Sequence, residues 1–235
     1  MTALVDRVRD RVCGELIKPT QSVAHRFDHV TRVLYNAATI ASTMIGVDTE
    51  LLYLAVLLHD VTPPALHKLE HVALSMRTAE TILLEEGCSD ERAKQVLEII
   101  AQHSTEHVET VKPTSNEAKV LFDADKLDGM GVIGIARVFA LFGQMGKSPI
   151  EAIAWCRNKI SLAHHHLQTE EGRRLFEARL EYVVGFLLEL EYSSGDKQPW
   201  PKMKCRDCLL LNRIFRWESL FARMAHKRVV FVSLL

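Results

Sequence analysis

Apolar side chains recur along this chain at the three- and four-residue spacing that is typical of amphipathic helices. Glycine and proline are sparse and stand mainly between the apolar segments, so few of the segments are interrupted. The predicted helices cover about residues 1–17, 23–44, 51–60, 72–85, 89–103, 118–128 and 150–190. The pattern predicts an all-α protein.

One segment is apolar on nearly every side. Residues 51–58 read Leu-Leu-Tyr-Leu-Ala-Val-Leu-Leu, and they are followed directly by His59 and Asp60. A helix without a polar face belongs in the core, so this pair is expected where water is scarce. Burying a carboxylate there costs on the order of several kcal/mol unless a cation or good hydrogen bonds compensate. The alternative interpretation is an ordinary helix end, with Asp60 capping the next turn.

A second histidine is predicted to face the same region. His29 shares a helix face with Val33 and should point inward. Consecutive helices joined by short loops usually pack antiparallel, which would bring the start of the 23–44 helix to the end of the 51–60 helix. His29, His59 and Asp60 could therefore converge, although a core histidine with a satisfied hydrogen bond explains His29 alone.

Two carboxylates interrupt the apolar helix that follows a predicted capping box at residues 114–117. Asp123 shares a face with Val120 and Leu127, whereas Asp125 shares one with Ala118 and Leu121. Spacing alone does not decide which of the two is buried. A surface helix with an acid paired to a neighbouring lysine remains the alternative.

The charge is distributed unevenly over the 235 residues. The net charge is −1, but residues 196–235 carry nine lysines and arginines against three acids, which leaves residues 1–195 at about −7. We expect one domain over 1–195 and a basic and apolar extension of unknown role over 196–235. Sequence-independent phosphate contacts by this extension are a poor explanation because its character is mixed, so nucleic acid is not expected as a partner.

Five scattered cysteines, an odd number, argue against a disulfide framework. The N-terminus lacks the apolar core of a signal peptide, and no run approaches the roughly 18 apolar residues of a membrane span. We therefore expect a cytoplasmic protein with reduced thiols and no membrane partner. Cys205 and Cys208 have zinc-like spacing but lack a partner pair, so a zinc site there is not expected.

The order of His, then His-Asp, then Asp, each on its own helix, resembles the HD-domain superfamily of metal-dependent phosphohydrolases. The similarity extends over about residues 5–192 and is carried by residues 24–33, 57–61, 101–104 and 117–139. It implies a helical bundle with a metal site between helices, and it selects Asp125 over Asp123. The implied metal ligands are His29, His59, Asp60 and Asp125, for a divalent ion such as Mn²⁺, Mg²⁺, Fe²⁺ or Zn²⁺.

The resemblance also suggests roles around the metal. Lys68 is a candidate for stabilising a transition-state phosphate, and His67 or His103 for proton transfer or phosphate contact. His25 could orient the site from its rim. Asp123 and Asp128 are candidates for substrate binding or for orienting the ligands.

The function implied is hydrolysis of a nucleotide or another small phosphate ester, at a phosphomonoester, phosphodiester or pyrophosphate bond. The alternative from another class is a metal- or nucleotide-sensing module that no longer turns over. Four intact ligand positions count against that alternative. The sequence leaves the substrate, the metal and any homo-oligomer open.

Overall fold

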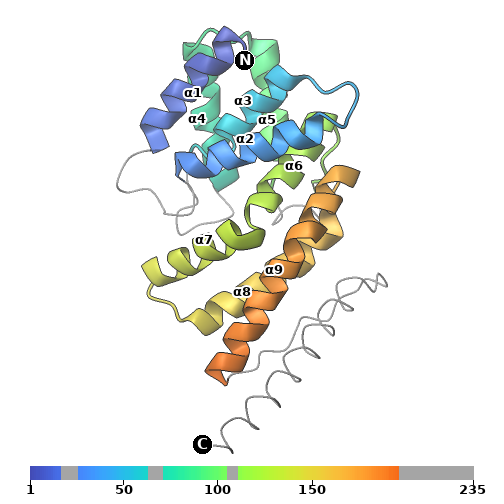
Figure 1. Cartoon of the computed structure of the whole chain (residues 1–235). Coiled ribbons are helices and arrows are strands. Elements are labelled where there is room, and N and C mark those ends of the chain that lie inside the picture. Colours follow the sequence, from blue (N-terminus) through green and yellow to red (C-terminus); the bar gives the residue numbers. More distant parts are fainter. Residues whose placement is uncertain (17–25, 63–70, 105–110, 196–235) are drawn as a thin grey trace, which may run out of the picture.

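The computed structural model describes residues 1–16, 26–62, 71–104 and 111–195 (Figure 1). Within these ranges the chain forms helices and no strand, so the all-α prediction is confirmed. The helices are α1 (Ala3–Leu16), α2 (Phe27–Ala41), α3 (Thr49–Leu58), α4 (His71–Glu85), α5 (Asp90–Ala101), α6 (Asn116–Asp128), α7 (Gly131–Gln144), α8 (Pro149–His166) and α9 (Glu170–Ser194).

The apolar helix α3 lies at the centre of the N-terminal part of the bundle. All its residues from Leu54 to Leu58 are buried, and α1, α2, α5 and α6 pack around it. Its start is fixed by Asp48, whose carboxylate accepts hydrogen bonds from the backbone N–H groups of Glu50 and Leu51, a standard N-cap. Burial on all sides is what its sequence predicted.

Helix α6 joins the two parts of the molecule. Figure 1 shows α1–α5 gathered on one side of it and α7, α8 and α9 on the other, and α6 packs on α2, α3 and α9. The chain then turns sharply into α7. Gly131 adopts a φ of +79°, and a Cβ on Gly134 would collide with the carbonyl of Gly129, so only glycine fits these positions.

The predicted capping box at residues 114–117 is wrong in its details. Ser115 is the N-cap of α6 and accepts from the backbone N–H of Ala118. The backbone N–H of Thr114 donates to Gln102, and the carboxylate of Glu117 accepts from the backbone N–H of Asp48 at 2.7 Å. The side chain expected to close the box instead joins α6 to the start of α3.

The helical region predicted over 150–190 consists of two helices, and the first of them ends at His166. Helix α8 ends before Leu167, and α9 begins after Thr169. Thr169 caps α9 by accepting from the backbone N–H of Gly172. Among the described residues no single helix is long and apolar enough to cross a membrane. The pair α6 and α7 passes that test only when the two are taken together across their 71° bend.

Candidate metal centre

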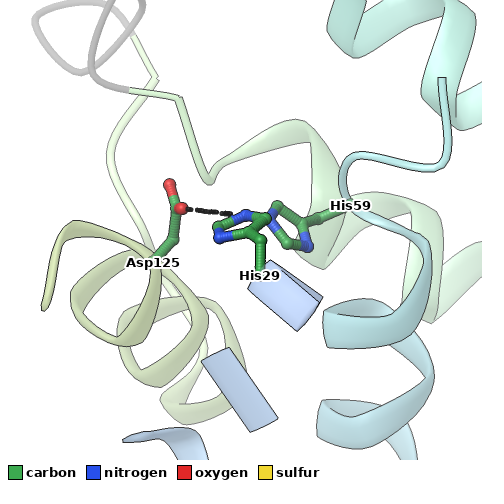
Figure 2. Close-up of side chains that lie close together, drawn as sticks. All are labelled: His29, His59 and Asp125. Atoms are coloured by element: carbon green, nitrogen blue, oxygen red, sulfur yellow. Dashed lines mark hydrogen bonds and ion pairs between the residues drawn. The ribbon is translucent and has the colours of Figure 1, made fainter. Parts of the chain in front are cut away.

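His29, His59 and Asp125 point toward one another from three different elements (Figure 2). His29 lies in the first turn of α2, His59 follows the last residue of α3, and Asp125 lies in α6. The two imidazole Nε2 atoms are 3.3 Å apart, and Oδ1 of Asp125 lies 3.7 Å from the first and 3.9 Å from the second. Three donor atoms thus surround one small space between the helices.

Asp60 adds a fourth donor to this space. Its Oδ2 lies 3.7 Å from Nε2 of His29 and 3.6 Å from Nε2 of His59. Both histidines and Asp60 are buried, with exposed fractions of 1%, 0% and 6%. Two imidazole nitrogens and two carboxylate oxygens within such distances are a donor set that suits a divalent cation, so the side chains present fit the metal that the sequence implied.

Each histidine is held by its other ring nitrogen. Nδ1 of His59 donates to the carbonyl of Val56 at 2.8 Å, and Nδ1 of His29 donates to Oδ2 of Asp128 at 2.7 Å. Because Nδ1 is the donor in both rings, Nε2 is the nitrogen that each ring turns toward the centre. Fixing the outer nitrogen in this way orients a metal-binding histidine.

Asp128 is itself surrounded by cations. Its Oδ1 accepts from Nε of Arg32 at 2.6 Å, and its Oδ2 also accepts from the guanidinium of Arg137. Burial would raise the pKa of this carboxyl, but the hydrogen bonds from His29 and Arg32 hold it below its usual range. Asp128 therefore contacts His29 as an anion, and its predicted role in orienting a ligand stays a prediction.

The pKa values of His29 and His59 are shifted in opposite directions. Burial lowers the pKa of His59 to about 4, so this ring is neutral. Burial acts the same way on His29, but hydrogen bonds with Asp128 and Asp60 raise its pKa above the ordinary value. A cation would bind each ring in its neutral form, through Nε2.

Asp125 is held ionised beside Lys126. Burial would raise its pKa, but the ammonium of Lys126 and the two histidines lower it. Nζ of Lys126 lies 2.6 Å from Oδ2 of Asp125, the oxygen that is not directed at the histidines. Sequence reasoning treated Lys126 only as a surface ion-pair partner and gave it no place in the site.

A second group of possible ligands adjoins the first. Oδ1 of Asp60 lies 3.6 Å from Nε2 of His103 and 3.8 Å from Nε2 of His71. Nδ1 of His103 donates to the carbonyl of Ile100 at 2.7 Å, so its Nε2 is also directed inward. Asp60, His71 and His103 are buried and close enough together to hold a cation. His71 was missed because its polar neighbours in the sequence suggested a solvated loop.

Asp123 has a different place from Asp125. It is fully buried and accepts from the backbone N–H groups of Gln168 and Thr169, at 2.8 and 2.7 Å, and from the hydroxyl of Thr169. It therefore joins α6 to the start of α9 and does not lie in the group of His29, His59 and Asp125. His25, His67 and Lys68 lie outside the described residues, so their roles stay predictions.

Comparisons with known proteins identify the family of this chain. A family model described as the HD domain matches residues 26–130. An uncharacterized protein of Bacillus subtilis strain 168, YpgQ, is 30% identical over 187 residues, which cover 77% of this chain and 90% of that protein.

Solved structures show the same similarity. A crystal structure of Bacillus subtilis YpgQ in complex with ADP matches with a TM-score of 0.63 at 27% identity, over 80% of this chain and 97% of that one. An HD-superfamily hydrolase from Bacillus thuringiensis matches with a TM-score of 0.61 at 25% identity, over 82% and 97% of the two chains. A protein from Lactobacillus plantarum, at 22% identity and a TM-score of 0.70 over 83% and 99%, shares the fold.

Proposed function

This chain belongs to the HD-domain superfamily, and from that premise we propose that it is a metal-dependent phosphohydrolase acting on a nucleotide. The observation that carries the proposal is the convergence of four donor atoms, from His29, His59, Asp60 and Asp125, on one buried space. Relatives named as hydrolases of this superfamily support hydrolase chemistry. The structure of YpgQ with ADP supports a nucleotide as the ligand.

The donor set also supports a choice among metals. Four single-atom donors would complete the tetrahedral shell that Zn²⁺ prefers, whereas they leave two positions on an octahedral ion such as Mn²⁺ or Mg²⁺. Hydrolysis needs an open position, so we favour an octahedral cation. When bound, such a cation supplies an activated water and neutralises charge on the phosphoryl group.

The remaining side chains would act on the substrate and on protons. His103 and His71 face Oδ1 of Asp60, whereas His29 and His59 face its Oδ2. They are therefore placed to contact a phosphate or to pass a proton to the leaving group. Lys68 and His67 keep their predicted roles as a phosphate-binding cation and a proton donor. We expect the reaction to take place in the cytoplasm.

The test is release of phosphate and of pyrophosphate from a panel of ribonucleotides, deoxyribonucleotides and cyclic nucleotides, with Mn²⁺, Mg²⁺ or a chelator. Asp125→Ala should abolish metal-dependent turnover, because it removes a ligand. Asp28→Ala is the matched control, since Asp28 is an exposed acid on α2 whose carboxylate accepts a hydrogen bond from Nη1 of Arg32. The product released also identifies the bond that is cut.

One alternative predicts a different outcome in the same experiment. A metal- and nucleotide-sensing module would bind Mn²⁺ and a nucleotide yet release neither product. Binding measured by calorimetry without turnover under any metal would favour that function over hydrolysis.

A further inference from the structure

Lys126 contacts a proposed metal ligand, yet neither the family resemblance nor the sequence pattern gave it a role in the centre. It follows Asp125 in α6, and its side chain is 14% exposed. The ammonium lies 5.1 Å from the centre of the Phe122 ring, a fully buried side chain one turn earlier on the same helix. The stem and the ring together hold the ammonium in place beside the carboxylate.

The two carboxylates of the centre share one property. Each directs a single oxygen at His29 and His59 and has its second oxygen facing another group. For Asp60 that group is the histidine pair His71 and His103. For Asp125 it is Lys126, whose Nζ lies 2.6 Å from Oδ2.

The number of donors decides how many positions a cation has left. A carboxylate can bind a metal through one oxygen or through both. With one oxygen from each carboxylate and two imidazoles, the protein fills four positions, and an octahedral cation keeps two for water and substrate. If Asp125 bound through both oxygens, only one position would remain.

We propose that Lys126 is a positioning residue that restricts Asp125 to a single metal-binding oxygen and thereby keeps a second coordination position open. The use of an open position rests on the proposed function, whereas the restriction of Asp125 rests on its contact with Lys126. A charge-assisted hydrogen bond of this length competes directly with the metal for Oδ2. The same ammonium also opposes metal binding electrostatically, so the open position is gained at some expense of metal affinity.

In Lys126→Met, the proposal predicts that metal affinity is kept or raised while one metal-bound water is lost. Without the ammonium, Asp125 can turn both oxygens to the cation, and one repelling charge is gone. We expect Mn²⁺ to bind as tightly as in the wild type or more tightly. If Lys126 only stabilised the fold, replacing it would weaken Mn²⁺ binding instead, since disordered ligands bind metals poorly.

The experiment uses the full chain, stripped of metal and reloaded with Mn²⁺. Isothermal calorimetry gives the Kd, and the longitudinal relaxation rate of water protons reports the waters bound directly to Mn²⁺. In Lys126→Met the relaxation enhancement per bound Mn²⁺ should fall by about half, since about one of two open positions closes. Turnover should fall roughly tenfold or more, the scale of losses seen for outer partners of metal ligands.

Two variants control this comparison. Lys119→Met removes the same charge from α6 two turns earlier and should leave affinity and relaxation unchanged. Lys126→Arg keeps a cation that can bond to Oδ2 and should resemble the wild type. An unchanged relaxation enhancement in Lys126→Met, or Mn²⁺ binding about tenfold weaker than in the wild type, would overturn the proposal.

Neither readout depends on turnover, so this proposal and the proposed function fail separately. A wild type that releases no product, combined with the expected loss of bound water in Lys126→Met, would remove the hydrolase but leave the role of Lys126. If Lys126→Met loses its helical circular dichroism, the wild type alone still decides: fewer than two exchangeable waters on its Mn²⁺ would overturn the proposal.

Discussion

Asp128 lies outside the proposed donor set but contacts one of its members, His29. It is 3% exposed, it accepts from Nδ1 of His29, and its charge is balanced by Arg32 and Arg137. A carboxylate in this position fixes the orientation of the ring and makes its Nε2 a stronger metal ligand. The two arginines allow it to stay ionised while buried.

Asp128→Asn tests this role. The amide keeps the size of the side chain but loses the charge, so we expect Mn²⁺ affinity to fall about 10- to 100-fold. Calorimetric titration of the metal-free protein with Mn²⁺ measures the effect. Asp28→Asn removes the other carboxylate that Arg32 contacts, at an exposed position, and affinity should stay unchanged there. Equal affinity in both variants would mean that Asp128 serves only the fold.

For single residues, the sequence indicated which side chains belong to the site better than it indicated which partners each one contacts. His29 and the His59–Asp60 pair follow from apolar spacing and helix order, and the structure brings them together. Asp123 and Asp125 could not be separated, because α6 is surrounded by other helices and both acids are turned inward to different partners. Only the resemblance to a known family favoured Asp125.

Among the elements, the start of α3 is held by the side chain of Asp48. Asp48 caps it and is bonded to Arg92 of α5, so the same carboxylate joins two helices. Burial would raise the pKa of Asp48, but the hydrogen bonds from Leu51 and Arg92 lower it overall. A carboxyl whose pKa is lower in the folded chain stabilises the fold above its unfolded pKa, and that contribution disappears as the pH falls through the folded pKa.

Asp48→Ala should therefore lower the free energy of unfolding by about 1 kcal/mol near neutral pH, the usual value of an N-cap. The difference between variant and wild type should shrink below about pH 4, where Asp48 begins to take up a proton in the unfolded chain. Urea unfolding of the metal-free protein, followed by circular dichroism at both pH values, measures this. Asp10→Ala, at an exposed carboxylate on α1, should change little, and a pH-independent difference for Asp48→Ala would contradict the assignment.

The element boundaries that the sequence missed have a common cause. Residues 150–190 read as one helical region, yet the chain breaks at Leu167–Thr169 because Asp123, more than 40 residues earlier, accepts two backbone N–H groups there. Glu117 likewise caps a distant backbone group and leaves its own helix start to Ser115. Local patterns carry no information about contacts of this range.

For the whole molecule, the division at residue 195 remains a prediction. α9 ends at Ser194, and its C-cap Gly195 adopts a φ of +72°, a common way for a helix to stop. A chain ending at Gly195 should unfold in a single transition at a denaturant midpoint close to that of the full chain, bind Mn²⁺ with equal affinity and keep its turnover. Loss of all three would show that residues 196–235 are part of the folded domain.

Helix α6 carries several of the contacts described above, and this limits which mutations it can tolerate. Within six residues, Asp123 joins α9, Asp125 faces His29 and His59, Lys126 contacts Asp125, and Asp128 contacts His29. Inserting or deleting one residue in that stretch would rotate everything after it by about 100° around the helix axis. No partial function would survive such a shift, so α6 should tolerate exchanges of side chains far better than any change of length.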